Sequence, residues 1–155
     1  MIDALQQAVR DQTRIGTSAL DVHAAAHDAS HFLLTPQAVV TAHDATEVAR
    51  LFGASARAGV PVTLRSGGTS LSGQGVTDGI LVDVRKGFRK TEVLDDGARI
   101  RTQPGVTVRR LNAELARYGR KIGPDPASEA ACTIGGVVAN NSSGMACGTI
   151  ENTHN

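Results

Sequence analysis

The deciding stretch of the chain is Pro61-Val62-Thr63-Leu64-Arg65-Ser66-Gly67-Gly68-Thr69-Ser70-Leu71-Ser72-Gly73-Gln74-Gly75, where an apolar run meets a loop of glycine and hydroxyl residues. The apolar, β-branched residues predict a strand over 62–64. Glycine lets neighbouring backbone N–H groups point into one concavity, and serine and threonine hydroxyls add uncharged donors, so the loop suits a phosphate or a pyrophosphate. A surface turn rich in small residues is the alternative interpretation.

The residues around Gly75 exclude two common nucleotide-binding loops. A Walker A loop needs lysine and then serine or threonine after its last glycine, whereas Gly75 is followed by Val76 and Thr77. The Rossmann pattern G-x-G-x-x-G opens a helix, whereas Gly79 comes one position late and precedes an apolar, strand-like run at 80–84. The loop therefore runs from strand to strand, and no helix dipole assists it.

The bulk composition is that of an ordinary globular chain. The 155 residues are 41% hydrophobic, 20% charged and 3% aromatic, which suits one domain or one large lobe with an aliphatic core. A formal net charge of +1 leaves no basic footprint for nucleic acid. The first residues lack a signal pattern and no eighteen apolar residues run together, so we expect a cytoplasmic protein without a membrane segment.

Two groups of residues leave alternatives open. Cys132 and Cys147 form no C-x-x-C pair, so buried or half-buried thiols are expected, with a disulfide or a redox role as the alternative. His23, His27 and His31 recur at intervals of four, which suits either a metal site on a helix or solvated and capping histidines. Because no acidic or cysteine partner is obvious, we assign no metal.

The first half of the chain predicts a strand-helix-strand unit. A modest amphipathic helix is expected over residues 3–15, a short strand over 38–42, and a third, buried strand over 80–84. Two parallel strands joined by a helix place the glycine loop at the carboxyl edge of the sheet, where open α/β sheets bind ligands.

The helix of this unit has clear start and stop signals. The sequence Asp44-Ala45-Thr46-Glu47 is a capping box, and Gly59 marks the end of the helix. Between them we expect Val48, Leu51 and Phe52 to face inward.

The second half predicts a hairpin and a packing helix. Runs at 91–94 and 98–103 flank the turn Asp95-Asp96-Gly97. A helix over 107–118 follows; its N-cap is Thr107, its stop is Gly119, and its apolar stripe is Val108, Leu111, Leu115 and Tyr118. The basic connection at 85–90 either contacts a phosphate or is a solvated loop.

A second stretch suggests binding chemistry. Residues 123–128 (Gly-Pro-Asp-Pro-Ala-Ser) are stiffened by two prolines. Residues 133–144 contain paired glycines, which permit close approach to a flat or anionic group, and asparagine amides, which both donate and accept hydrogen bonds. A structural bend with asparagine turns is the alternative, but two such segments indicate a ligand longer than one phosphate.

Taken in order, these segments resemble a known family. The series Arg65–Gly73, Pro104-Gly105-Val106, Gly123–Ser128 and Thr133–Asn141 is similar to the FAD-binding domain of the vanillyl-alcohol oxidase and p-cresol methylhydroxylase type. Within that superfamily the chain resembles the FAD-linked dehydrogenases of 2-hydroxy acids, the group of the glycolate oxidase flavin subunit and D-lactate dehydrogenase. The resemblance covers about Asp28 to the last residue.

The resemblance implies an α+β fold with two lobes, a small strand-helix-strand lobe and an incomplete second lobe with a mixed sheet. It assigns residues 1–30 to an N-terminal helical segment and 31–155 to the FAD-binding domain. It implies non-covalent FAD, because Thr69 stands where some relatives carry the histidine that bonds the flavin. The implied cofactor-binding residues are Ser66, Gly67, Gly68, Thr69, Ser70, Leu71 and Ser72 at the pyrophosphate, with Pro124, Asp125, Pro126, Ser128, Thr133, Ile134, Gly135, Gly136, Asn140, Asn141 and Gly144 along the ribityl chain and flavin ring.

The resemblance also implies a function in a longer enzyme. Relatives continue beyond Asn155 with their substrate-binding part, so the chain resembles an N-terminal fragment, with no catalytic residue assigned and no turnover expected alone. The full enzyme is expected to be a flavin-dependent oxidoreductase that oxidises a small 2-hydroxy acid such as lactate or glycolate. The alternatives are a truncated, non-catalytic nucleotide-binding remnant and a small regulatory module with an empty loop.

Overall fold

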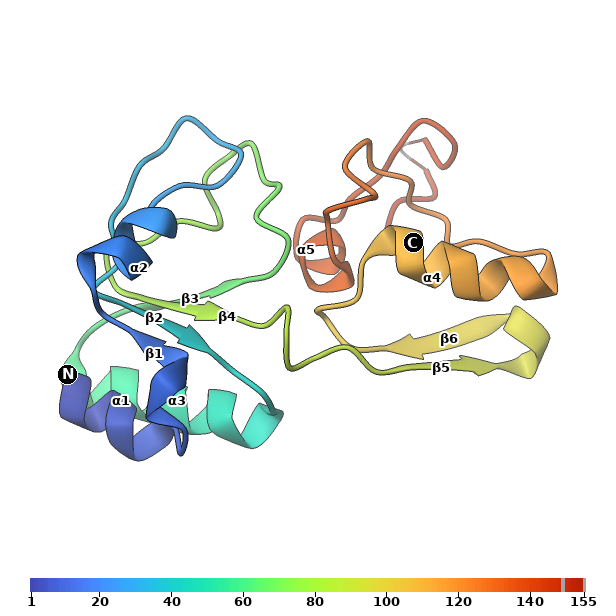
Figure 1. The fold of residues 1–155 in the computed structure, drawn as a ribbon. Coiled ribbons are helices and arrows are strands. Elements are labelled where there is room, and N and C mark those ends of the chain that lie inside the picture. The colour runs from blue at the N-terminus through green and yellow to red at the C-terminus, as the bar shows by residue number, and fades with distance from the viewer. Residues whose placement is uncertain (149, 155) are drawn as a thin grey trace. The chain divides into compact units, whose positions relative to one another are not determined.

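A four-stranded sheet forms the centre of the first of two compact units, Met1–Gly87 (Figure 1). The computed structural model describes residues 1–148 and 150–154. The strands are β1 (Ile15–Gly16), β2 (Ala38–Thr41), β3 (Val62–Arg65) and β4 (Ile80–Asp83), in the order β1-β2-β4-β3. The strand β4 pairs in parallel with both β2 and β3, and all four of its residues are buried, as its apolar sequence predicts.

Helices cover both faces of this sheet. Figure 1 shows α1 (Ile2–Ala8) and α3 (Ala45–Ala58) on one face and α2 (Ala19–Ala24) on the other. The core between them is aliphatic, with Leu5, Leu51 and Val82 fully buried. The predicted strand-helix-strand unit is therefore confirmed, and the structure adds that β4 lies between its two parallel strands.

The predicted start and stop of α3 are confirmed in part. The Asp44 side chain accepts the backbone N–H of Glu47 at 2.7 Å, and the left-handed Gly59 (φ 65°) ends the helix. The reciprocal half of the capping box is not made, because the Glu47 carboxylate accepts from the His43 N–H and pairs with Arg14 instead.

Three sequence predictions about the helices are wrong, one on the length of a helix and two on inward-facing residues. The helix expected over residues 3–15 ends at Ala8 because the backbone is extended at the buried Val9, and residues 12–14 form a separate 3₁₀ turn (η1), capped by the Asp11 side chain. Phe52 is 47% exposed because Glu47, Leu51, Ala54 and Ser55 take the inward face of α3. Tyr118 is 46% exposed because the α-helix has already ended before it.

The second unit, Phe88–Asn155, contains the predicted hairpin and helix. The strands β5 (Thr91–Leu94) and β6 (Arg99–Thr102) pair antiparallel around the turn η2 (Asp95–Gly97). The packing helix α4 (Val108–Leu115) begins at its predicted N-cap Thr107 and continues as η3 (Ala116–Tyr118) to Gly119. Val108, Leu111 and Leu115 are buried, as the stripe predicts.

The structure adds a short helix, α5 (Ile134–Ala139), where the sequence indicated only a small-residue segment. Its first N–H groups are held by the Pro104-Gly105-Val106 turn: Ile134 donates to the Val106 carbonyl at 2.9 Å and Gly135 to the Pro104 carbonyl at 3.0 Å. A Cβ on Gly135 would lie 2.7 Å from the Pro104 Cβ, whereas one on Gly136 would meet nothing within 4 Å. Only the first of the two glycines is required by packing within the unit.

A buried ion pair ties the N-terminal segment to the sheet and to α3. Two nitrogens of the Arg14 guanidinium donate to the two oxygens of Glu47, at 2.6 and 2.7 Å, and one of them also donates to the Thr41 carbonyl at 2.8 Å. The side chains of Arg14 and Glu47 are 15% and 3% exposed. The hydrogen bonds from Arg14 lower the pKa of Glu47 below its ordinary value, although burial acts in the opposite direction.

The substitution Glu47→Gln should lower the free energy of unfolding by about 3 kcal/mol at neutral pH, because it leaves the Arg14 guanidinium buried without its carboxylate. The folded-state pKa of Glu47 lies below the unfolded one. The contribution is therefore fully present above the unfolded pKa and is lost as the pH falls through the folded pKa. Urea titrations at a series of pH values measure both effects.

The matched control is Glu92→Gln. Its ion pair with Arg101 is solvent-exposed, at 55% and 74% for the two side chains, so a change of less than about 1 kcal/mol is expected. If the two variants lost the same free energy of unfolding, the larger contribution assigned to the buried pair would be contradicted.

A second prediction concerns the adjacent glycines of α5. The substitution Gly135→Ala should destabilise the chain by about 1–2 kcal/mol because the added methyl group overlaps Pro104. Gly136→Ala should be neutral or stabilising by up to about 1 kcal/mol, because alanine favours the helix and has open space there. Thermal unfolding of the two variants measures the difference, and the reverse order of stability would refute it.

Candidate functional site

The glycine loop leaves the carboxyl end of β3, which lies beside the carboxyl end of its parallel neighbour β4, as predicted, and then leads to the start of β4. Residues 66–70 are half-buried, whereas Leu71 is 77% exposed. The loop therefore begins within the fold and reaches solvent at its middle.

The loop carries a run of unused donors. Among the residues that the structure describes, no protein acceptor bonds the backbone N–H groups of residues 67–71. Gly68 has a left-handed backbone (φ 66°), which breaks the extended course of the chain. The Ser70 hydroxyl contacts the Gln74 side chain and accepts the Ser72 N–H at 3.2 Å. Such unpaired N–H groups suit an anion that supplies several acceptor oxygens.

Arg65, the last residue of β3, hydrogen-bonds both the end of the loop and the end of α2. Its Nε donates to the Gly75 carbonyl at 2.7 Å, and one terminal nitrogen donates to the Ala25 carbonyl at 2.8 Å. The residue is 9% exposed, and burial lowers the pKa of its guanidinium.

A segment upstream of the sheet closes the loop from the other side. One oxygen of Asp28 accepts the Ser30 N–H at 2.8 Å, the other accepts the Gly75 N–H at 3.2 Å, and Ala29 donates to the Gly68 carbonyl at 3.1 Å. Burial raises the pKa of Asp28, but these hydrogen bonds and Arg65 outweigh it and lower the pKa below its ordinary value. We call residues 25–30 the brace.

No local pattern in the sequence assigns Arg65 or Asp28 to the site. In the sequence, Arg65 is the first residue of the motif series Arg65–Gly73, and Asp28 only marks where the family resemblance begins. A buried arginine at a strand end signals partners that must be carbonyls or carboxylates, but sequence alone does not say which.

In the second unit the predicted residues form two groups. Thr133–Gly136 lie beside the Pro104 turn through the hydrogen bonds described above, and the N–H of Gly136 has no acceptor among the described residues. The Asp125 carboxylate accepts the Ala146 N–H at 3.1 Å with each oxygen, and a Cβ on Gly144 would overlap Asp125. Asp125 and Gly144 are therefore brought together by the fold of the unit.

The asparagine segment follows α5. Asn140 is exposed, whereas the Asn141 side chain accepts the His154 N–H at 2.9 Å. The His154 ring lies 2.7 Å from the Val138 carbonyl, so this histidine is anchored to the end of α5.

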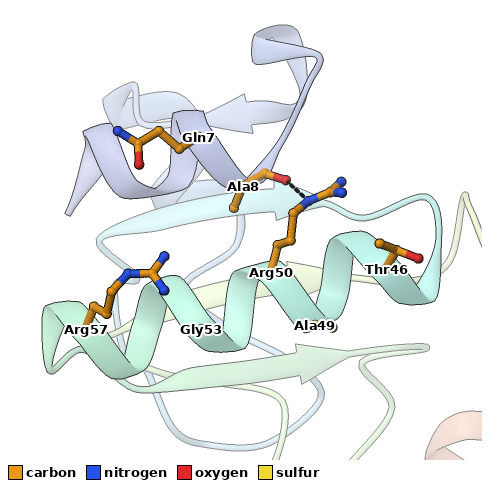
Figure 2. A pocket seen from close by; sticks show the side chains of 7 residues that line it. All are labelled: Gln7, Ala8, Thr46, Ala49, Arg50, Gly53 and Arg57. Carbon is orange, nitrogen blue, oxygen red and sulfur yellow. Dashed lines mark hydrogen bonds between the residues drawn. The ribbon is translucent and has the colours of Figure 1, made fainter.

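Hollows occur in both units. In the second unit, a hollow of about 490 Å³ is lined by two predicted site residues, Pro124 and Ile134, among mainly apolar neighbours. In the first unit, Figure 2 shows a hollow of about 540 Å³ over α1 and α3, where Arg50 Nε donates to the Ala8 carbonyl at 2.9 Å. None of the predicted cofactor-binding residues lines the hollow in Figure 2.

The basic connection fits a solvated loop. Arg85 donates to the Asp83 carboxylate at 2.6 Å, and Lys86, Arg89 and Lys90 are exposed. A further hollow, of about 430 Å³, is lined by Arg65, Asp83 and Arg85.

Among the described residues, the cysteines and histidines form neither a disulfide nor a cluster of metal ligands. Cys132 is buried and Cys147 half-buried, both are free thiols as predicted, and burial raises the pKa of Cys132. No group of three potential metal ligands occurs among residues 1–148 and 150–154. The described helices are too short or too polar to cross a bilayer.

Comparisons with known proteins identify the family. Residues 36–155 match the family described as FAD binding domain. A D-2-hydroxyglutarate dehydrogenase from Pseudomonas putida is 34% identical over 132 residues, which cover 83% of this chain and 13% of that protein. The glycolate oxidase subunit GlcD from Escherichia coli strain K12 is 32% identical over 120 residues, which cover 76% of this chain and 24% of that protein. The chain thus spans a quarter or less of these two relatives.

The solved structures agree on the fold. An alkyldihydroxyacetonephosphate synthase matches with a TM-score of 0.82 at 21% identity, covering 99% of this chain and 32% of that one. The predicted α+β fold class, the resemblance to FAD-linked 2-hydroxy-acid dehydrogenases and the predicted cofactor, FAD, are confirmed. The chain belongs to the FAD binding domain family.

Proposed function

We propose that the loop Ser66–Ser72 holds the pyrophosphate of FAD. The observation that carries this proposal is the run of backbone N–H groups at 67–71, which have no acceptor among the described residues. A pyrophosphate supplies several anionic oxygens, and hydrogen bonds to an anion are stronger than those between neutral groups. The left-handed Gly68 supports the proposal because it turns the chain without adding a side chain to the concavity.

The second part of the site is proposed to lie along the ribityl chain and flavin ring. Its residues are Pro124, Asp125, Pro126, Ser128, Thr133, Ile134, Gly135, Gly136, Asn140, Asn141 and Gly144. Gly136 is the best supported, because the packing of its own unit does not require a glycine there and its N–H is unused by the described residues. Asp125 and Gly144 support the shape of this part through their mutual packing.

The full enzyme is proposed to be a flavin-dependent oxidoreductase that oxidises a 2-hydroxy acid such as lactate or glycolate. The names of the relatives, D-2-hydroxyglutarate dehydrogenase and glycolate oxidase subunit, support this substrate class. When bound, FAD supplies the two-electron acceptor chemistry. This chain's contribution is to bind and orient the cofactor, and we assign no acid or base among its described residues. The rival proposal is a non-catalytic nucleotide-binding remnant.

Two finer points belong to the same proposal. FAD is held non-covalently, because Thr69 has no nucleophilic nitrogen with which to bond the flavin. The protein works in the cytoplasm, which the two free thiols support, since reducing compartments keep cysteines unpaired.

The purified chain should bind FAD and show a flavin spectrum in the visible range. Acid precipitation should release all of the flavin into the supernatant, because no covalent bond holds it. A chain that remains colourless after incubation with FAD would support the remnant, and flavin that stays in the precipitate would refute the non-covalent attachment.

The loop itself is tested by Gly68→Val, which should lower FAD affinity at least about tenfold. A β-branched residue strains the left-handed backbone at φ 66° and places a side chain in the loop. The control is Arg89→Ala in the basic connection, which should leave FAD affinity unchanged because Arg89 is exposed. Titrations of FAD against each variant measure the affinities, and equal losses would show that the pyrophosphate has been assigned to the wrong segment.

A further inference from the structure

We propose that Arg65 and Asp28 are positioning residues for the glycine loop, which they hold in its cofactor-ready shape without touching FAD. This inference rests on the proposed role of the loop at the pyrophosphate. Its basis is a set of hydrogen bonds that fixes Gly68 and Gly75, while the N–H groups of residues 69–71 between them have no acceptor among the described residues.

Arg65 links the loop to α2. The loop turns around the Arg65 side chain: Nε bonds Gly75, and a Cβ built on Gly68 would lie 3.6 Å from the Arg65 Cδ. The terminal nitrogen bonds Ala25, which is the C-cap of α2, where a cation is favoured by the carbonyl groups that end a helix. One side chain therefore bonds the far end of the loop and the brace, and its stem lies close to the place where a Gly68 side chain would be.

Asp28 accepts the second backbone hydrogen bond of Gly75. The N–H of this buried glycine bonds Asp28 and its carbonyl bonds Arg65, so both of its polar backbone groups are taken. A Cβ on Gly75 would lie 3.0 Å from an Asp28 oxygen and 3.6 Å from the Arg65 Nε. The absence of a side chain at this position therefore allows the two charged groups to close on the backbone.

The brace is itself anchored. Ala26 is buried and its carbonyl accepts the Leu34 N–H at 3.0 Å, and His27 forms a bridge with Leu33. The first turn of the loop is fixed to this anchored segment by the bond from Ala29 to the Gly68 carbonyl. A loop rich in glycine loses much conformational freedom on ordering, so fixing it before binding should strengthen the affinity for FAD.

The test uses Asp28→Asn and Arg65→Met in the 155-residue chain, with FAD and riboflavin as probes. An asparagine keeps the shape of Asp28, but its NH₂ group cannot accept one of the two N–H bonds. Methionine keeps much of the Arg65 stem and donates nothing. We expect at least about a tenfold loss of FAD affinity in each variant. Binding of riboflavin, which lacks the pyrophosphate, and the melting temperature of the ligand-free chain should change little.

Matched controls are Asp21→Asn and Arg50→Met. Asp21 hydrogen-bonds within its own helix cap at Ser18, and Arg50 bonds a backbone carbonyl in the hollow of Figure 2, so neither touches the loop. Both should keep FAD affinity within about threefold of the original chain.

The outcomes separate the two proposals. If Asp28→Asn keeps full FAD affinity while Gly68→Val loses it, the loop binds the cofactor but the positioning role is wrong. If FAD affinity, riboflavin affinity and melting temperature fall together, Asp28 and Arg65 serve general stability and the inference is overturned. If none of the three variants changes FAD affinity, the proposed role of the loop itself fails. Should Arg65→Met not fold, Asp28→Asn alone decides.

Discussion

Burial of β4 between two parallel neighbours is the constraint on which the first unit depends. Every residue of this strand is enclosed, and its backbone pairs with β2 on one side and β3 on the other. Parallel pairing brings the carboxyl ends of all three strands to one edge of the sheet. The glycine loop therefore leaves β3 at that edge and must return to the start of β4 at the opposite edge. Residues on this return path are not part of the sheet, so their N–H groups need not pair with a neighbouring strand.

The charged residues of this unit serve the same arrangement. Arg14 and Glu47 fasten the N-terminal segment to α3 and to the end of β2, whereas Arg65 fastens the loop to the end of α2. In both cases a guanidinium joins segments far apart in the chain by bonding backbone carbonyls, and Arg14 bonds a carboxylate as well. Arginine suits this work because its planar fork offers five donors in fixed directions.

Local sequence patterns predicted most of the helices, strands and turns, but they did not predict which residues far apart in the chain contact each other. The strands, the caps of α3 and α4 and the hairpin follow from periodicity and turn chemistry within a few residues. Phe52 was misplaced because the inward face of α3 is chosen by what it packs against, and Tyr118 because α4 ends before it. The loop was found from its glycines, but Asp28, which bonds it across 47 positions, carries no local signal. The prediction of FAD as the cofactor rested on several motifs in their order along the chain, and no single motif was sufficient for it.

The brace also bears on where the folding unit begins. The match to the FAD binding domain family starts at residue 36, yet Ala25, Asp28 and Ala29 lie before it and bond the loop or Arg65 within it. A chain trimmed to the family boundary would keep every residue of the loop and lose three of the hydrogen bonds that shape it. The limits of a family match thus mark shared sequence, whereas the physical unit that shapes the loop extends further towards the N-terminus.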